Sequence, residues 1–108
     1  MSDFASKSCV PCEGGVPPLT EAERAGLTPH LGDEWSVVGG HHLECEWSCP
    51  DFVSALVFTN AAGTICEAQG HHADFELGWG RGQAKIWTHK IDGLTESDFV
   101  LAAKFDRI

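Results

Sequence analysis

Three histidines, His71, His72 and His89, lie close to two acids, Glu67 and Asp98, in the C-terminal part of the chain. Histidine exchanges protons near neutral pH because the pKa of a free imidazole is about 6.5. An imidazole beside carboxylates is therefore suited to general acid–base catalysis, which contributes roughly 10²- to 10⁴-fold to a rate. These residue types predict proton transfer as the chemistry of this region.

The same residues stand in a specific order. A glutamate precedes the paired histidines as E-x-x-x-H-H, a strand leads to T-H, and G-L-T-E-x-D-F-x-L-A follows, over residues 67–102. The N-terminal segment 9–20 reads C-x-x-C-x-G-G-x-P-P-L-T. With these motifs, the chain resembles the pterin-4a-carbinolamine dehydratases over nearly its whole length. It departs from the family at Ala73, where a proline is usual; this frees the backbone but removes no proton-transfer group.

The resemblance implies a hydro-lyase that dehydrates 4a-hydroxytetrahydropterin to quinonoid dihydropterin in tetrahydrobiopterin recycling. It implies His71 and His89 as the proton-transfer pair and His72 as a residue that binds and orients the pterin. Glu67 and Asp98 would hold the imidazoles in the right tautomer. The elimination needs no metal and no organic cofactor. Trp87 either stacks on a flat heterocycle or covers the sheet face, and we expect stacking.

Two of the acids have alternative roles. Glu67 stands four residues before His71, one helical turn away, so its carboxylate can accept a hydrogen bond from an imidazole or remain a solvated helix-end acid. Asp98 can cap a helix that begins after Thr95, or it can hydrogen-bond an imidazole, for which we expect His89 across the connecting loop. His30, His41 and His42 lie outside the motif and are interpreted as surface residues.

Capping residues, glycine turns and prolines along the chain predict seven helices and strands. Thr20 and Glu23 form a capping box for a first helix that ends near 26–29. Residues 35–38 and 41–47 form a hairpin around Gly39-Gly40, and Pro50, capped by Ser48 or Cys49, opens a helix to about Ala68. Residues 73–77 and 84–88 form a second hairpin around 80–82, and a last helix begins after Thr95. The α-β-β-α-β-β-α order predicts an α+β fold, a four-stranded antiparallel sheet with three helices on one face.

Strand alternation predicts which side chains share a face. One face is expected to pack under the helices and to carry Ala73, Phe75, Leu77, Ala84, Ile86 and Thr88. His72 and His89 then fall on the open face of the sheet beside Trp87. His71 lies at the strand entrance, where alternation is a weak guide to side-chain direction. We expect it to approach the site from the preceding loop. Two imidazoles and an indole are therefore expected to line one shallow site.

Length and charge limit the function classes. The chain has 108 residues, 16 Asp and Glu against 7 Lys and Arg, and a formal net charge of −9. We expect an N-terminal arm over 1–18 and a single domain over 19–108. Anionic partners would repel this surface, so neither nucleic acid nor a membrane is expected as a partner. We expect neither a signal peptide nor a membrane-spanning segment, and the five cysteines predict a cytoplasmic protein with free thiols.

Other function classes remain open. A non-catalytic dimerisation or assembly cofactor of the same fold is the main alternative, because one scaffold can host unrelated tasks. A zinc protein is a weaker one, since Cys9 and Cys12 have the spacing of a zinc knuckle but no second ligand pair is recognisable. The open sheet and the resemblance both predict a homodimer or homotetramer.

Overall fold

The computed structural model describes residues 4–10 and 14–108. Helices and strands follow the predicted order: α1 (Glu21–Leu27), β1 (Trp35–Val38), β2 (His42–Ser48), α2 (Phe52–Gln69), β3 (Asp74–Gly78), β4 (Arg81–Ile86) and α3 (Glu96–Phe105). Short 3₁₀ turns occur at η1 (Phe4–Ser6), η2 (Thr28–His30) and η3 (His89–Ile91).

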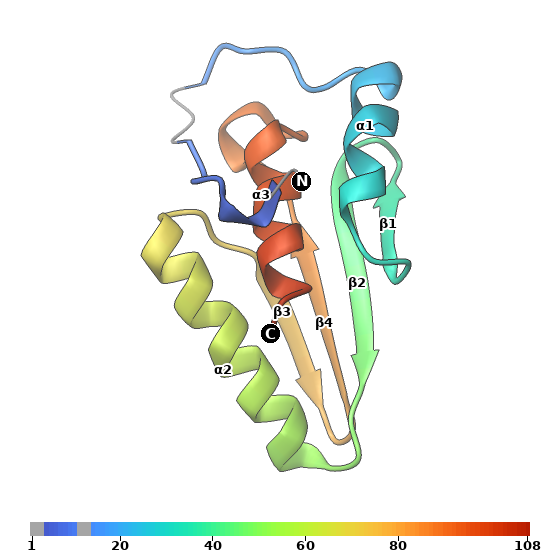
Figure 1. Ribbon diagram of the computed structural model, residues 1–108, viewed down its shortest axis with the longest axis vertical. Helices are drawn as coiled ribbons and strands as arrows, with labels where there is room; N and C mark the ends of the chain where they lie inside the picture. The colour runs from blue at the N-terminus through green and yellow to red at the C-terminus, as the bar shows by residue number, and fades with distance from the viewer. Residues whose placement is uncertain (1–3, 11–13) are drawn as a thin grey trace.

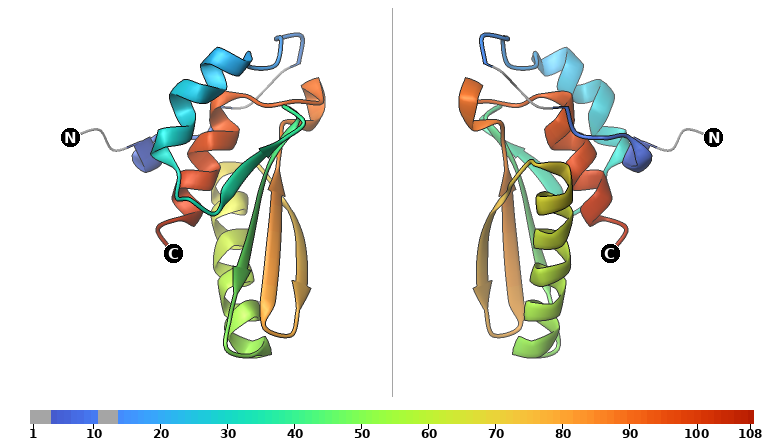
Figure 2. Two further views of the ribbon diagram at one scale, coloured as in Figure 1. Left: turned by 90° about the vertical axis from the view of Figure 1, so that its right-hand side faces the viewer. Right: turned by 90° about the vertical axis from the view of Figure 1, so that its left-hand side faces the viewer.

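The strands form one antiparallel sheet in the order β1-β2-β4-β3. The two hairpins meet along their second strands, where Leu43 of β2 pairs with Ile86 of β4. Figures 1 and 2 show the three helices on one face of this sheet. The predicted α+β fold is thereby confirmed, and the opposite face carries no α-helix of the described chain.

Side-chain caps determine where the helices begin. The predicted capping box of Thr20 and Glu23 is present at α1. The prediction for α2 was wrong in detail, because Asp51, rather than Ser48 or Cys49, is the N-cap residue. Its carboxylate accepts a hydrogen bond of 2.8 Å from the Ser54 backbone N–H, which lowers the pKa of Asp51. A charged acceptor next to the helix start satisfies a free N–H and suits the helix dipole.

The core is centred on α3. This helix is buried on almost every side because the sheet packs against it from one direction and the N-terminal segment from another. Phe99, Val100 and Leu101 of α3 are at most 2 % exposed. Leu94 is fully buried just before the helix, which places it and Phe99 together in the core, as a hydrophobic staple requires.

Residues 4–10 of the predicted N-terminal arm pack against α3. Phe4, Ala5 and Cys9 are each 8 % exposed, and the Phe4 ring stacks on His30 with centroids 4.4 Å apart. Cys12, the other half of the predicted Cys pair, lies outside the described residues. None of the helices in 4–10 and 14–108 is both long and apolar enough to cross a membrane.

Burial makes a testable prediction for the thiols. It raises the pKa of Cys9 and Cys45 to about 11 and also raises that of Cys66, so these thiols stay protonated at neutral pH. Because the thiolate is the reactive form, iodoacetamide at pH 7 should leave all three unmodified in the folded protein and modify them in urea. Peptide mass spectrometry measures both states. Rapid modification of Cys9 in the folded protein would show that the arm leaves α3.

Oligomerisation remains a prediction, now with a surface that can be tested. Val53 and Val57 stand one helical turn apart on α2 and are 66 % and 62 % exposed, and Phe52 and Leu56 beside them are 42 % and 37 % exposed. Apolar patches of this kind usually lie at an interface. We expect light scattering to give a dimer or tetramer, and Val57→Glu to reduce its mass. A parent mass of 11.7 kDa at micromolar concentration would contradict this expectation.

Candidate active site

A cavity of about 320 Å³ opens between the turn after α2 and the segment after β4. His71 and His72 line it from the first segment, and Trp87 and His89 from the second, together with Gly70, Thr88 and Lys90. The structure therefore brings together all three histidines that the sequence singles out, and Trp87 with them.

A glycine turn directs His71 out of α2 toward α3. Gly70 adopts a left-handed conformation with φ of 63°, which few other residues tolerate. The backbone N–H of His71 donates to the Cys66 carbonyl at 3.2 Å, and that of Gly70 donates to the Glu67 carbonyl at 3.4 Å. This pair of bonds is the Schellman motif. The motif fixes the backbone of His71 although the residue lies outside the helix.

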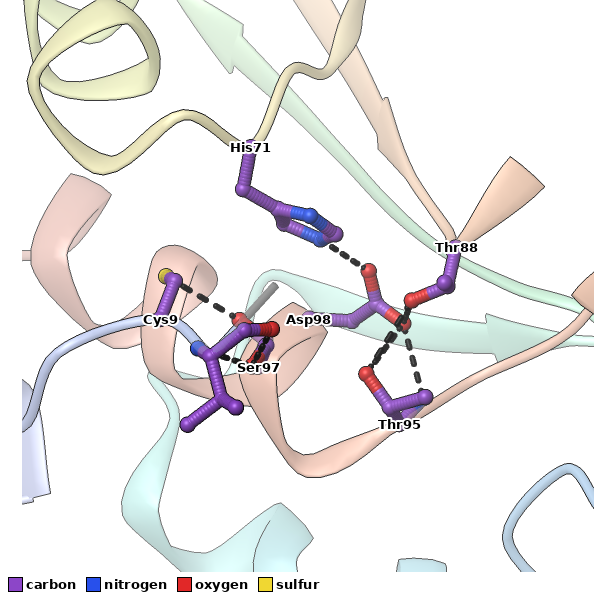
Figure 3. Close-up of polar contacts among 7 residues, drawn as sticks. Cys9, His71, Thr88, Thr95, Ser97 and Asp98 are labelled. Atoms are coloured by element: carbon purple, nitrogen blue, oxygen red, sulfur yellow. Dashed lines mark hydrogen bonds and ion pairs between the residues drawn. The ribbon is translucent and has the colours of Figure 1, made fainter. Parts of the chain in front are cut away.

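Asp98 is the buried partner of His71 (Figure 3). Its Oδ1 lies 2.5 Å from Nε2 of His71, and the two side chains are 0 % and 16 % exposed. Its Oδ2 accepts hydrogen bonds of 2.8 Å from the Thr95 backbone N–H and from the Thr88 hydroxyl. One carboxylate therefore caps α3 and holds an imidazole at the same time. The two roles that the sequence offered as alternatives are both filled.

The expected partner of Asp98, His89, was the wrong histidine. The chain closes a loop in which the Thr88 backbone N–H donates to the Gly93 carbonyl at 2.8 Å, and this closure begins η3 at His89. Thr88 points inward to the carboxylate, whereas His89 is exposed and packs edge-to-face on Trp87 with ring centroids 4.3 Å apart. The inward position of Thr88 and the outward position of Trp87 follow the predicted alternation.

Glu67 pairs with His72. Its Oε2 lies 2.9 Å from Nε2 of His72, and the two side chains are 82 % and 58 % exposed. His71, although one helical turn away from Glu67, is turned toward α3 by Gly70 and is not its partner. An exposed pair of this kind contributes little to stability, since water screens it. Its effect is to orient the His72 ring at the mouth of the cavity.

His41 and His42, interpreted from the sequence as surface residues outside the motif, are partly exposed and lie beside Trp87. The ring of His41, in the turn before β2, lies 5.3 Å from the Trp87 ring, and that of His42, on β2, lies 5.9 Å from it. Nδ1 of His41 lies 3.0 Å from Nδ1 of His42, and Nε2 of His41 lies 2.7 Å from Asp92. Burial, followed by the neighbouring His41, lowers the pKa of His42. The pairing of β2 with β4 is the signal that places residue 42 beside residue 87, and spacing along the chain does not reveal it.

A comparison with known protein families decides the family of this chain. The model of the pterin 4 alpha carbinolamine dehydratase family matches residues 17–108. The chain belongs to this family.

Full-length relatives agree with that assignment. A protein of Rubrobacter xylanophilus is 52% identical over 100% of both chains, and one of Alkaliphilus metalliredigens is 47% identical over 99% of this chain and 96% of its own. Both carry the name "putative pterin-4-alpha-carbinolamine dehydratase". A Brucella melitensis crystal structure, described as a transcriptional coactivator/pterin dehydratase, superimposes with a TM-score of 0.77 at 28% identity, covering 83% of this chain and 96% of that one.

Ala73, at the entrance to β3, lies beside the Cys66 thiol of α2. Burial raises the pKa of Cys66, and the nearby backbone N–H of Ala73 opposes this increase. A proline at this position has no N–H to donate. Alanine at position 73 therefore keeps a backbone N–H beside the Cys66 thiol.

Metal ligands do not converge in the part of the chain that the structure describes. Over residues 4–10 and 14–108, His, Cys, Asp and Glu side chains form no group of three or more that could hold an ion. Cys9 instead directs its thiol to the Ser97 carbonyl at 3.5 Å.

Proposed function

We propose that this chain dehydrates 4a-hydroxytetrahydropterin to quinonoid dihydropterin by histidine general acid–base catalysis, as a lyase of tetrahydrobiopterin recycling. The observation that carries the proposal is the buried His71–Asp98 contact at a cavity that His72, Trp87 and His89 also line. Membership of the pterin carbinolamine dehydratase family supports the substrate class.

The elimination requires one acid and one base. The substrate carries a hydroxyl on C4a and a hydrogen on the adjacent N5. When the C4a–O bond breaks, a proton must reach the departing hydroxyl to form water. The N5 proton must be removed so that the electrons of the N5–H bond remain on the ring as the C4a–N5 double bond forms. Two imidazoles, one protonated and one neutral, supply both transfers, and no cofactor takes part.

The contact with Asp98 prepares His71 for either transfer. A carboxylate only accepts hydrogen bonds, so it keeps the proton of a neutral His71 on Nε2 and leaves Nδ1 free to accept a proton. When His71 takes up a proton, the adjacent negative charge stabilises the imidazolium. His89 is the other member of the proton-transfer pair. Its ring is exposed and packs edge-to-face on Trp87. The two imidazoles can exchange roles for opposite faces of the substrate.

The other residues that line the cavity bind the pterin ring. Trp87 provides a flat apolar wall, and His72, oriented by Glu67, supplies a polar group at the mouth. The cavity volume of about 320 Å³ lies at the lower end of the range of roughly 300–1,000 Å³ for small-molecule sites. A bicyclic pterin ring has dimensions that suit such a cavity.

The test is an ultraviolet assay of 4a-hydroxytetrahydropterin decay with and without the purified protein. Acceleration at protein concentrations far below that of the substrate supports the dehydratase. Decay at the uncatalysed rate, with pterin binding seen by quenching of tryptophan fluorescence, would instead favour the non-catalytic binder. The assay therefore separates the two function classes with one preparation.

A further inference from the structure

The N-terminal segment is attached to both elements that form the His71–Asp98 contact. The backbone N–H of Cys9 donates to the Gln69 side-chain carbonyl at 2.9 Å. The backbone N–H of Val10 donates to the Ser97 hydroxyl at 2.8 Å, and that hydroxyl lies 3.2 Å from the Val10 carbonyl. We call Cys9 and Val10 the strap.

Both attachment points are close in sequence to the two residues of the His71–Asp98 contact. Gln69 is the last residue of α2, two positions before His71, and Ser97 immediately precedes Asp98 in the first turn of α3. Figure 3 shows Cys9 and Ser97 beside the contact between His71 and Asp98. The strap thus links the backbones that carry the imidazole and the carboxylate.

The remainder of the arm is attached separately, at the far end of α3. Lys104 donates to the Ala5 carbonyl at 2.7 Å at the far end of α3, and Phe4 and Ala5 are buried there. At the strap itself Cys9 is 8 % exposed, and its thiol faces the Ser97 carbonyl at 3.5 Å. Burial raises the pKa of this thiol to about 11, so no thiolate charge arises near Asp98 at neutral pH. The strap itself therefore contributes hydrogen bonds and no charge, whereas Lys7 of the arm is charged and pairs with Glu96 at the start of α3.

We infer that the strap is a positioning element for the His71–Asp98 pair. A hydrogen bond as short as 2.5 Å between groups on two different helix ends depends on their relative position. Displacement of a catalytic group by 1 Å can cost about 100-fold in rate. By joining Gln69 to Ser97, the strap limits the movement of one helix end against the other. The catalytic consequence rests on the proposed function, whereas the structural one does not.

The variants that test this inference are Gln69→Ala and Ser97→Ala, with Lys104→Met as the matched control. Gln69→Ala and Lys104→Met each remove one hydrogen bond between the arm and the body of the protein, and Ser97→Ala removes the two that join Ser97 to Val10. The bond lost in Lys104→Met lies away from the pair. We expect Gln69→Ala and Ser97→Ala to lower kcat by about 3- to 30-fold with KM within twofold, since a loosened pair falls short of a full 1 Å displacement. Lys104→Met should keep the parent kcat.

A second readout does not depend on turnover. The proton of a short imidazole–carboxylate hydrogen bond gives a far-downfield ¹H NMR resonance, which His71→Ala assigns. Gln69→Ala and Ser97→Ala should move it upfield or broaden it, and Lys104→Met should leave it in place. An unchanged resonance in both strap variants would overturn the inference even if the parent proves inactive. Equal losses of kcat in Lys104→Met and Ser97→Ala would also overturn it, because they would indicate general loosening of the arm.

Discussion

Replacement of Asp98 by Asn is expected to lower kcat by about 10²- to 10⁴-fold while the protein remains folded. Asp98 is fully buried and joins three groups: His71, the Thr95 backbone N–H and the Thr88 hydroxyl. Asparagine has nearly the same shape, and its single carbonyl can still accept the hydrogen bonds from Thr95 and Thr88. Its amide NH₂ group then faces His71.

This exchange reverses the hydrogen bond to the imidazole. An NH₂ group donates, so Nε2 of His71 must accept, and the proton of the neutral ring moves to Nδ1. The corresponding exchange in a serine protease triad costs about 10⁴-fold in kcat for the same reason. The protonated ring also loses its anionic partner, so the acidic limb of the remaining pH–rate profile should move to lower pH.

Thr88→Val is the matched control for Asp98→Asn. It removes one hydrogen bond to the same carboxylate but preserves the charge and the contact with His71. We expect it to cost about 1 kcal/mol in stability, measured by urea unfolding, and to leave the pH–rate profile unchanged. If Asp98→Asn itself turned over normally with an unchanged profile, Asp98 would act only as a helix cap.

His71→Ala and His89→Ala are each expected to lower kcat at least tenfold with unchanged far-ultraviolet circular dichroism. The structure predicts that they differ in stability. Loss of His71 leaves Oδ1 of Asp98 buried without its partner, which costs on the order of 1–3 kcal/mol. His89 is exposed, so its removal should leave the urea midpoint nearly unchanged.

His30→Ala serves as the control histidine, because its ring stacks on Phe4 and does not line the cavity. It should retain the parent kcat. Full activity in His71→Ala or in His89→Ala would remove that residue from the proton-transfer pair. A His71→Ala variant as stable as the parent would show that water or a rotated hydroxyl satisfies the buried carboxylate.

The elements of the fold were predictable because their signals are local. Thr20 with Glu23 is a capping box that a reader of the sequence can recognise, and it starts α1 in the structure. Alternation along 84–88 placed Thr88 inward, and it is 4 % exposed. The N-cap residue of α2 was harder to predict, because Ser48, Cys49 and Asp51 all lie within two residues of Pro50.

The pairing of side chains within the site was less predictable, since it depends on how separate elements meet. Asp98 contacts His71 rather than His89 because a glycine turn and a closed 88–93 loop direct the two rings to different places. His41 reaches Trp87 only because β2 lies between β1 and β4. Spacing in the sequence identified the groups that take part, and the three-dimensional arrangement determined their partners.

The double use of the Asp98 carboxylate affects how related sequences are interpreted. A descendant that abandoned proton transfer would still need an acceptor for the Thr95 backbone N–H at the start of α3. Selection for folding alone would then preserve the acid. An aspartate at this position is therefore poor evidence that a relative is an enzyme. The imidazole at position 71 is the better marker, because a chain that had lost the reaction would have less reason to retain it.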